Sequence, residues 1–396
     1  GTNGKTTVAT LAKQILTSAG KQPALISTCV HQIGSRCIPA QSTTPECTDL
    51  QRYFAEMAER GIGYAVMEVS SHSLDQHRVR GIPFRVGVFT NITAHEHLDY
   101  HGAFANYRRA KARLFESLAD DATAVLNADD PECGFFLNHT QANVLTYGLR
   151  SPADVTASVE ALGLNGMTLQ IHTPAGPLRV RSPLVGRYNV LNLLAGTCIG
   201  LSLRIGLGAI AKGIERFTGA PGRLERIDMG QSFTVLVDYA HNADGLRSML
   251  GALRDLVSGG QRLIVVFGAG GDRDRSKRPL MGKAADDLAD VAVLTADNSR
   301  SESTDAIIGE IEGGFANGTP RHIVPDRREA IRNALEMAAP GDVVVIAGKG
   351  HETSQEINGV RYLFDDREEA RRVLLALTTR RGRGPSRPPL AMAGSS

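Results

Sequence analysis

Short runs of consecutive apolar residues recur along the chain, and each is followed by a polar cluster and then by a segment typical of a helix. These runs occupy residues 64–67, 86–89, 122–126, 235–237, 263–267, 291–294 and 343–346. Near-continuous apolar strands that alternate with helices indicate parallel sheets buried on both faces. The sequence therefore predicts an α/β protein whose polar clusters lie at the carboxyl ends of the strands, where such sheets bind ligands.

The chain opens with Gly1-Thr2-Asn3-Gly4-Lys5-Thr6-Thr7, which matches the end of a phosphate-binding loop. Glycines let backbone N–H groups close around phosphate oxygens, Lys5 reaches the β- and γ-phosphates, and the Thr6 hydroxyl can ligate Mg²⁺. The apolar residues that follow share one face of a helix: Val8, Leu11, Ala12 and Ile15. The N-terminus of that helix would face the anion, so we expect a nucleotide phosphate to bind here.

The length and punctuation of the chain predict two domains. Its 396 residues exceed what one compact core usually supports. Residues 151–185 have the pattern of short antiparallel strands inserted beside the main sheet, and Gly219-Ala-Pro-Gly222 marks a boundary. We therefore expect a first domain over 1–222, a second over 223–377, and a disordered tail rich in Pro, Gly and Arg over 378–396.

Composition narrows the functional class. The 44 Lys and Arg residues nearly balance the 42 Asp and Glu residues, so no strong overall charge points to nucleic acid or membrane. No apolar run approaches the roughly 20 residues that span a bilayer. The five cysteines are scattered without C-x-x-C spacing, which indicates reduced thiols in a cytoplasmic protein and disfavours structural zinc.

Several motifs, in a specific order and spacing, make nearly the whole chain similar to the Mur ligases, the ATP-dependent enzymes that add amino acids to the peptidoglycan precursor. They are residues 1–6, Glu68-Val-Ser-Ser-His-Ser-Leu-Asp-Gln-His-Arg78, 97–102, Gly186-Arg-Tyr-Asn-Val-Leu-Asn192, Asp238-Tyr-Ala-His241, 270–274 with 277–279, Asp297-Asn-Ser-Arg300 and Gly348-Lys-Gly-His-Glu352. The resemblance implies a central ATPase domain of the phosphate-loop type with a mostly parallel sheet, followed by a Rossmann-like α/β domain.

The resemblance also implies the chemistry. Members activate a carboxylate by phosphoryl transfer from ATP, and the acyl phosphate is attacked by an amine, so positioning and charge neutralisation dominate. Catalytic roles would fall to Lys5, His97 and Lys111, with Lys111 carried as a carbamate. Magnesium ions would be held by Thr6, Glu68, His97 and carbamylated Lys111. The segment before His97 is one residue longer than the family pattern, so His95 competes for the metal role.

The substrate residues implied by the resemblance fall into three sets. ATP would contact the loop residues Gly1, Thr2, Asn3, Gly4, Lys5, Thr6 and Thr7, together with Asn189, Asn192, Arg223 and Asp238. A UDP-N-acetylmuramoyl dipeptide would contact Thr43, Thr44, Ser70, Gln76 and Arg78. The amino-acid acceptor would contact Arg273, Asp297, Asn298, Ser299, Arg300, Gly348 and Glu352.

The acceptor set indicates which amino acid is added. Family members that use meso-diaminopimelate carry Asp-Asn-Pro-Arg, and this chain keeps the arginine as Arg300 but has Ser299 in place of proline. A guanidinium–carboxylate pair would select diaminopimelate, because lysine lacks the distal carboxylate and would leave the arginine unpaired. Loss of the proline removes a fixed φ and could loosen the loop.

Other readings stay open. The chain could add L-lysine to the muramoyl dipeptide, or could be an amide ligase of the folylpolyglutamate synthase or cyanophycin synthetase type. A nucleotide-binding relative without ligase activity is a further alternative. In each ligase reading we expect a monomer acting on small molecules in the cytoplasm.

Family members also carry an N-terminal domain that binds the uridine nucleotide, and then the strand that leads into the phosphate loop. Neither precedes Gly1 here. We therefore expect a fragment whose sheet lacks a central strand and which is unstable or poorly active in isolation.

Overall fold

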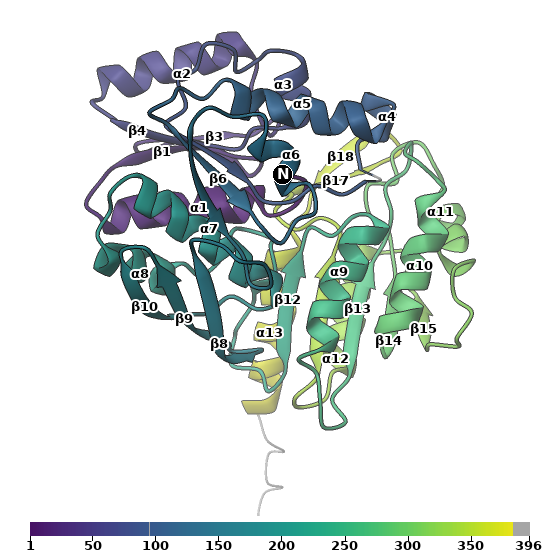
Figure 1. Cartoon of the computed structure of the whole chain (residues 1–396). Coiled ribbons are helices and arrows are strands. Elements are labelled where there is room, and N and C mark those ends of the chain that lie inside the picture. Colours follow the sequence, from purple (N-terminus) through teal and green to yellow (C-terminus); the bar gives the residue numbers. More distant parts are fainter. Residues whose placement is uncertain (95, 383–396) are drawn as a thin grey trace, which may run out of the picture. The chain divides into compact units, whose positions relative to one another are not determined.

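The computed structural model describes residues 1–94 and 96–382, and of residues 379–382 only the backbone (Figure 1). The chain divides into two compact units, Gly1–Arg223 and a second that begins at Leu224. Across the described residues, no helix combines the length and the apolar character needed to cross a membrane. His95, the predicted alternative metal ligand, lies outside the described residues.

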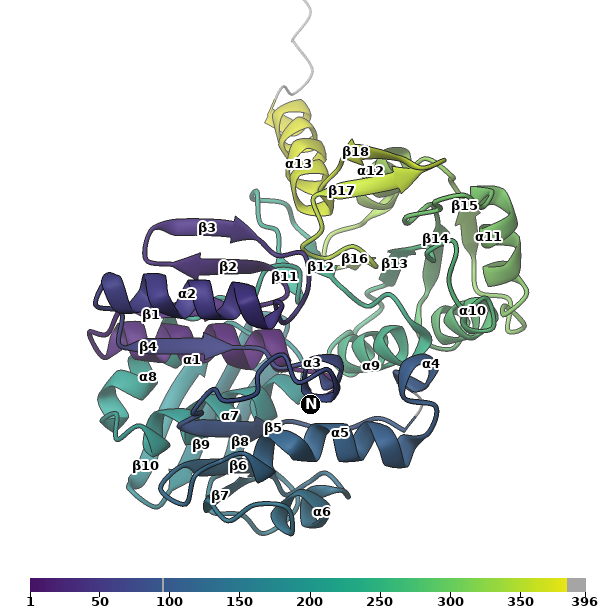
Figure 2. The same cartoon turned by 90° about the horizontal axis from the view of Figure 1, so that it is seen from above.

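The first unit holds three sheets, with orders β3-β2-β1-β4, β5-β6-β7 and β10-β9-β8. Pairing is parallel between β1 and β4 and throughout β5-β6-β7, which Figure 2 shows side by side. The strands are β1 (Pro23–Ile26), β2 (Val30–Ile33), β3 (Arg36–Pro39), β4 (Tyr64–Met67), β5 (Val86–Phe89), β6 (Thr123–Asn127), β7 (Asn143–Tyr147), β8 (Thr156–Gly163), β9 (Gly166–Thr173) and β10 (Gly176–Ser182).

The third of these sheets is the insertion that the sequence predicts. Its strands β8, β9 and β10 pair antiparallel in chain order, because short connections allow consecutive strands to fold back on each other. The alternating burial of β9 and β10 places one face of this sheet on the core. The predicted insertion over 151–185 is therefore an antiparallel three-stranded sheet.

The helices of the first unit are α1 (Lys5–Ser18), α2 (Cys47–Glu59), α3 (Ser71–Asp75), α4 (Leu98–His101), α5 (Phe104–Glu116), α6 (Cys133–Leu137), α7 (Tyr188–Ser202) and α8 (Leu207–Arg216). Helix α1 begins directly after the glycine loop, as predicted. Its residues Val8, Leu11, Ala12 and Ile15 are buried in a core shared with α7, α8 and the inserted sheet. This packing fixes the helix whose N-terminus carries the loop.

Strands β4 and β5 are both edge strands, because in the described residues neither pairs on its second side. A largely apolar cavity of about 710 Å³ is lined by both strands, by α1 and by α5, and it reaches Gly1 and Lys5 of the loop. In the described residues, β4 and β5 thus face this cavity without a strand paired between them. The instability expected from a missing central strand stays a prediction.

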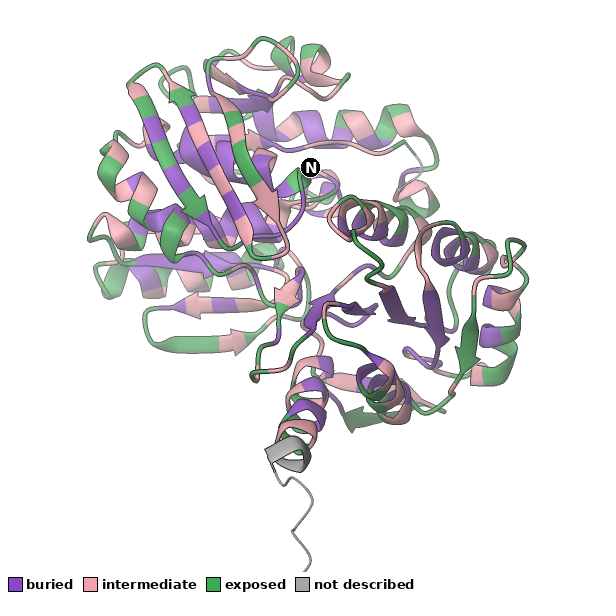
Figure 3. Ribbon diagram, turned by 90° about the horizontal axis from the view of Figure 1, so that it is seen from below, coloured by how far each residue is buried: buried purple, intermediate pink, exposed green. Residues whose placement is uncertain are grey.

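The second unit is built on one six-stranded sheet of order β11-β12-β16-β13-β14-β15. All pairs are parallel except that of the short edge strand β11. Every residue of β12, β13, β14 and β16 is buried (Figure 3), as expected for a sheet covered on both faces. The strands are β11 (Glu225–Arg226), β12 (Thr234–Asp238), β13 (Leu263–Phe267), β14 (Val291–Leu294), β15 (Arg321–Ile323) and β16 (Val343–Ala347).

Helices cover both faces of that sheet. Figure 2 shows α9 (Ala243–Arg254) and α10 (Lys277–Leu288) on one face, and α12 (Arg327–Met337) and α13 (Asp366–Gly382) on the other. Helix α11 (Thr304–Glu312) packs beside α10, and a hairpin of β17 (Ser354–Ile357) and β18 (Val360–Leu363) precedes α13. Residues 378–382, which the sequence assigns to the tail, continue α13, and residues 383–396 lie outside the described residues.

Close packing of α8 on α1 generates a stability prediction. A Cβ at Gly213 would come within 2.7 Å of the Ile15 Cα, whereas a Cβ at Gly208 of the same helix meets nothing within 4 Å. Gly213→Ala should lower the free energy of unfolding by about 1–3 kcal/mol through overpacking. Gly208→Ala should leave it unchanged or raise it by up to about 1 kcal/mol through helix propensity. Urea unfolding of both variants measures the difference, and equal effects would contradict this account of the contact.

Candidate active site

The glycine loop has the backbone shape of an anion cradle. Gly4 has φ 83°, in the left-handed region, and a Cβ there would lie 2.5 Å from the Asn192 Oδ1. The backbone N–H of Thr2 donates to the Asn91 carbonyl at 2.8 Å, which ties the loop to the segment after β5. Because α1 begins at the next residue, its first N–H groups are available to a bound anion. The loop therefore fits a phosphate group.

Lys5 lies over this loop. Its Nζ donates to the carbonyls of Gly1 at 3.0 Å and Thr2 at 2.8 Å. Burial lowers the pKa of Lys5, the Glu68 carboxylate opposes that shift, and the nearby Arg223 guanidinium adds to it. These two cations of the first unit are thus close enough to interact, and a bound polyphosphate would neutralise both.

Glu68 brings together the end of β4, the loop and the turn after β1. Its side chain is 2% exposed. The Thr6 hydroxyl donates to its Oε2 at 3.0 Å, the Thr28 N–H to its Oε1 at 2.8 Å, and the Thr28 hydroxyl to its Oε2 at 3.1 Å. Two of the predicted magnesium ligands, Thr6 and Glu68, are therefore in direct contact, and both offer the oxygen ligands that Mg²⁺ prefers.

The residues predicted to bind the muramoyl dipeptide gather beside Glu68. The Thr44 hydroxyl donates to the Glu68 carbonyl at 2.9 Å and accepts from the Ser70 N–H at 3.1 Å. Arg78 donates to the Thr44 carbonyl at 3.0 Å and to the Gln76 side chain at 2.7 Å. The remaining member, Thr43, is 3.2 Å from the Thr28 hydroxyl, so all five lie in one polar region.

Lys111 and His97 share the surroundings of Tyr107. Lys111 is 5% exposed, and its Nζ lies 4.5 Å from the centre of the Tyr107 ring. Burial holds the pKa of Lys111 well below its usual value, and Lys5 adds to the effect. Burial, with Lys111 and Lys5 nearby, lowers the pKa of His97 to about 4, so its imidazole is neutral at pH 7. A neutral imidazole is the form that binds metals.

His97 also adopts an unusual backbone conformation, with φ 58° at the N-cap of α4. Its ring lies 5.5 Å from that of Tyr107 and 5.2 Å from that of His72. A non-glycine residue in the left-handed region costs of order 1–3 kcal/mol, and such strain is concentrated at functional sites. Packing of the His97 ring between the rings of Tyr107 and His72 therefore holds a backbone conformation that a non-glycine residue disfavours.

The asparagines predicted to lie near adenine are both buried in α7. Asn192 donates to the Asn189 Oδ1 at 2.8 Å, and Asn189 donates to the Val185 carbonyl at 2.7 Å. Asn192 also lies against Gly4, as described above. Their side chains are thus adjacent to the loop. In the second unit, Asp238 accepts from the backbone N–H groups of Leu224 and Ala240 at 2.8 and 2.9 Å.

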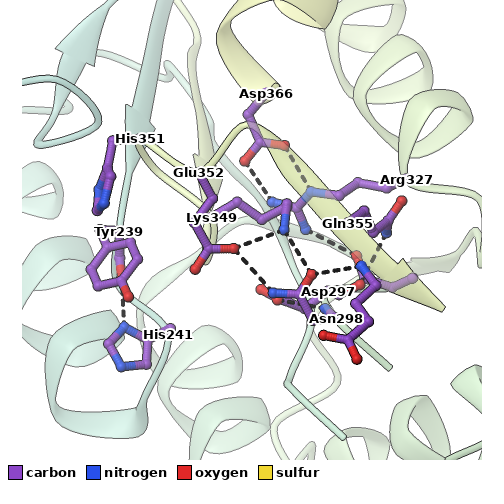
Figure 4. Close-up of polar contacts among 12 residues, drawn as sticks. Tyr239, His241, Asp297, Asn298, Arg327, Lys349, His351, Glu352, Gln355 and Asp366 are labelled. Carbon is purple, nitrogen blue, oxygen red and sulfur yellow. Dashed lines mark hydrogen bonds and ion pairs between the residues drawn. The ribbon is translucent and has the colours of Figure 1, made fainter. Parts of the chain in front are cut away.

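The predicted acceptor residues of the second unit lie at the carboxyl ends of β14 and β16. Figure 4 shows Asn298, Lys349 and Glu352 in a closed triangle. The Lys349 Nζ donates to the Asn298 Oδ1 at 3.0 Å and to the Glu352 Oε2 at 2.9 Å, and the Asn298 Nδ2 donates to the same Glu352 oxygen at 3.0 Å. Asp297 lies beside them, with its Oδ2 2.5 Å from where a Cβ of Gly348 would be.

The two predicted arginines converge at Gly270. A Cβ on Gly270 would lie 3.1 Å from the Arg300 Nη1 and 3.7 Å from the Arg273 Cγ. Arg300 donates to the Gly271 carbonyl at 2.6 Å and has φ 50°. Ser299 is 1% exposed, and its hydroxyl is without a hydrogen-bond partner in the described part of the chain. The loops that follow β13 and β14 therefore carry Arg273, Asn298 and Arg300 at the carboxyl ends of neighbouring strands.

Some residues of these clusters are not in the predicted set. Lys349 stands inside a motif that the sequence singles out, yet only its burial shows that it joins Asn298 to Glu352. The Tyr107 hydroxyl forms a hydrogen bond of 2.8 Å with the Thr2 hydroxyl. The residues around Tyr107 in the sequence do not predict that contact. Arg327 and Asp366 form a fully buried ion pair behind Asp297 and are 39 positions apart in the sequence.

Whether the chain fits a divalent metal depends on its donor set. No group of three or more His, Cys, Asp and Glu side chains that could hold a metal occurs within residues 1–94 and 96–382. The oxygens of Thr6 and Glu68 are nonetheless together, and a site that also uses phosphate oxygens needs few protein ligands. The residues present thus fit Mg²⁺ bound with a nucleotide.

Comparison with protein families places both units in the Mur ligases. Residues 1–200 match the Mur ligase middle domain, and residues 222–350 match the Mur ligase glutamate ligase domain. A UDP-N-acetylmuramoyl-L-alanyl-D-glutamate–2,6-diaminopimelate ligase of Geobacillus thermodenitrificans is 46% identical over 94% of this chain and 77% of that protein. The protein of the same name from Gloeobacter violaceus is 45% identical over 97% of this chain and 77% of that protein.

Solved structures agree and confirm the predicted fold class. One of a UDP-N-acetylmuramoyl-L-alanyl-D-glutamate–2,6-diaminopimelate ligase superposes with a TM-score of 0.70 at 38% identity, covering 96% of this chain and 77% of that one. A folylpolyglutamate synthase from Mycobacterium tuberculosis has the same fold, with a TM-score of 0.70 at 20% identity over 89% of this chain and 87% of that one. The chain belongs to the Mur ligase family of ATP-dependent amide ligases.

Proposed function

We propose that this protein adds meso-diaminopimelate to the D-glutamate carboxylate of UDP-N-acetylmuramoyl-L-Ala-D-Glu, in peptidoglycan biosynthesis, with ATP as the phosphoryl donor. The observation that carries the proposal is that the Arg300 guanidinium and the stem of Arg273 both lie at Gly270, on loops next to the Asn298–Glu352 hydrogen bond. A guanidinium at Arg300 and a carboxylate at Glu352, both joined to the loop that carries Asn298, suit an acceptor that carries a carboxylate and an ammonium group. The similarity to relatives with this activity in their names supports the same substrate.

The phosphoryl-transfer half of the reaction belongs to the first unit. The D-glutamate carboxylate attacks the γ-phosphorus, ADP leaves, and an acyl phosphate results. Lys5 and the loop amides bind and orient the phosphates, and they offset the charge that builds up in the transition state. Thr44, Ser70 and Arg78 would hold the dipeptide end near Glu68.

The amide-forming half uses the acceptor residues. The amine nitrogen attacks the acyl carbon, phosphate leaves, and the ammonium proton must be lost before attack. Glu352 would bind that ammonium group, and its hydrogen bonds with Lys349 and Asn298 support a fixed orientation. Arg300, whose Nε lies 4.0 Å from the Glu356 Oε2, would bind the distal carboxylate, and L-lysine lacks that carboxylate and so forgoes this ion pair.

Lys111 would act as a carbamate. Carbamate formation joins CO₂ to an uncharged amine with loss of a proton, and the lowered pKa of Lys111 favours that uncharged form. Without the carbamate, the positive charge of Lys5 contributes to the lowered pKa of Lys111. The negative charge of the carbamate would offset that positive charge. Magnesium would be held by Thr6, Glu68, His97 and this carbamate, and it would supply charge neutralisation at the phosphates.

The same proposal covers partners and location. The substrates are small molecules, no membrane or nucleic-acid partner is needed, and we propose a monomer that works in the cytoplasm. The folylpolyglutamate synthase and cyanophycin synthetase alternatives do not explain an Asp-Asn-Ser-Arg motif whose Arg300 guanidinium lies at Gly270. An inactive relative does not explain why the phosphate, metal and acceptor residues are all retained.

The function is tested by ADP release from ATP in the presence of the muramoyl dipeptide and an amino acid, with the product identified by mass. We expect release that requires both substrates and prefers meso-diaminopimelate to L-lysine in direct competition. Preference for lysine would overturn the acceptor assignment. Binding of ATP with no turnover under any acceptor would favour the inactive relative.

Arg300→Lys should remove most of that preference. Lysine keeps the charge but loses the two-pronged guanidinium geometry, so KM for diaminopimelate should rise about 10- to 100-fold with little change in KM for ATP. The matched control is Arg321→Lys, because Arg321 is paired with Glu312 on the surface of the same unit. If the Arg300 variant uses diaminopimelate and lysine in the same ratio as the wild type in direct competition, the role of Arg300 is refuted.

Lys111→Ala should lower kcat by at least about 100-fold, because it removes both the carbamate charge and its magnesium contact. Added acetate or propionate should restore part of the rate by supplying the missing carboxylate. The control is Lys212→Ala, at an exposed lysine of α8. A Lys111 variant that turns over at the wild-type rate would exclude the carbamate.

A further inference from the structure

A fully buried ion pair stands behind the predicted acceptor residues. Arg327 is the first residue of α12 and Asp366 the first of α13, and both side chains are 0% exposed. The Arg327 Nε donates to the Asp366 Oδ1 at 2.8 Å and its Nη2 to the Oδ2 at 2.7 Å. The carboxylate thus neutralises the guanidinium in a two-pronged pair, which fixes the plane of the guanidinium.

The remaining donors of Arg327 bind two strand ends. Its Nη1 donates to the Ala296 carbonyl at 3.1 Å and its Nη2 to the Ala347 carbonyl at 2.9 Å. Ala347 ends β16, and Ala296 follows β14 by two residues. These strands are not paired with each other, since β13 lies between them. Arg327 therefore spans the end of β13 and ties together two segments that the sheet itself does not join.

Both carbonyls immediately precede residues of the acceptor set. Asp297 follows Ala296, and Gly348 follows Ala347. The gap between these two is small, because a Cβ on Gly348 would lie 2.5 Å from the Asp297 Oδ2. Burial alone would raise the pKa of Asp297, but Lys349 and Arg327 hold it below its usual value. A displacement of either strand end would thus change the spacing of the acceptor loops directly.

We propose that Arg327 is a positioning residue for the acceptor site: paired with Asp366, it sets the separation of the Asp297-Asn298 loop from the Gly348–Glu352 loop. The acceptor readout of this proposal rests on the proposed function, whereas the loop geometry does not. Apart from the electrostatic effect of Arg327 on Asp297, the hydrogen bonds of Arg327 to this region go to the backbone carbonyls of Ala296 and Ala347, so it positions the loops through the backbone.

The choice of residue types supports positioning over stability. A buried ion pair contributes little net stability, because the desolvation of both charges offsets their attraction, and an apolar pair of similar size is often as stable. Only a guanidinium offers enough donors in a fixed plane to bind a carboxylate and two carbonyls at once. The pair therefore gives the chain a fixed geometry that an apolar pair would not give.

The opposite end of the same sheet provides a matched control. Arg262 and Asp342 precede β13 and β16, and Arg262 donates to Asp342 at 2.6 Å and to the Met337 carbonyl at 2.7 Å. This second arginine–aspartate pair has the same chemistry and also binds a backbone carbonyl. It lies at the amino ends of the strands, away from Asn298 and Glu352. Arg262→Lys and Arg327→Lys therefore make the same change at the two ends of one sheet.

The first measurement is amide hydrogen exchange on the full chain, which needs no substrate. In Arg327→Lys we expect exchange at least about tenfold faster at Glu356, whose N–H donates to the Asn298 Oδ1, and at Gly348. In Arg262→Lys those two amides should be unchanged, and the faster exchange should appear at Val343, whose N–H donates to the Arg262 carbonyl. Equal protection of Glu356 and Gly348 in both variants would overturn the proposal.

The second measurement separates substrate KM values. Arg327→Lys should raise KM for the amino-acid acceptor about tenfold or more and leave KM for ATP and for the muramoyl dipeptide within about twofold. Arg262→Lys should change none of them. If all KM values of the Arg327 variant rise together, or none rises, positioning of the acceptor loops is refuted. If the wild type turns over no acceptor, the proposed function fails while the exchange result still decides the loop geometry.

A second variant keeps the test decisive if Arg327→Lys does not fold. The double variant Arg327→Met with Asp366→Leu replaces the pair by apolar side chains and leaves no buried charge unpaired, so it should fold, with a denaturant midpoint lowered by the loss of the donors to the Ala296 and Ala347 carbonyls. It should nonetheless show the same faster exchange at Glu356 and the same rise in acceptor KM. A stable double variant with wild-type exchange and wild-type KM would show that the pair has no positioning role.

Discussion

The carboxyl ends of parallel strands constrain this protein more than any other feature. Within a parallel sheet, hydrogen bonds between neighbouring strands pair the backbone N–H and C=O groups. Beyond the last paired residue, each buried N–H and C=O needs a hydrogen-bond partner from a side chain or a loop. The chain meets that need with side chains that include the proposed site residues. Glu68 accepts from the Thr28 amide, Asp238 from two amides, and Arg327 donates to two carbonyls. The side chains that complete these backbone hydrogen bonds are therefore also ones to which a functional role is proposed.

The parts predicted from sequence are those with a local signal. The four buried strands β12, β13, β14 and β16 of the second unit begin and end within one residue of the predicted apolar runs. Their limits are clear in the sequence because a strand buried on both faces is apolar at nearly every position. The loop of residues 1–7 is recognisable because its glycines and Lys5 are adjacent in sequence. The motifs at the strand ends also identify the family, because their order along the chain is specific.

The parts that sequence did not predict depend on contacts between distant residues. The hairpin of β17 and β18 has mixed burial and exposed residues, so its pattern does not distinguish it from a loop. Arg327 and Asp366 stand at ordinary helix starts, where a charged residue is usually solvated. Only the fold shows that they meet at zero exposure. Likewise, Lys349 carries no signal that separates it from a surface lysine until its burial between Asn298 and Glu352 is seen.

The two units differ in how they treat buried cations, and the difference follows their ligands. In the first unit, neither Lys5 nor Lys111 forms an ion pair with a described carboxylate, and burial lowers the pKa of both. In the second unit, Lys349 is paired with Glu352 and Arg327 with Asp366. A nucleotide polyphosphate brings several negative charges and can neutralise unpaired cations, whereas an amino acid brings nearly balanced charge, so it would not neutralise Lys349 and Arg327 together. The distribution of ion pairs is thus the one expected if the first unit binds phosphate and the second orients an acceptor, as proposed.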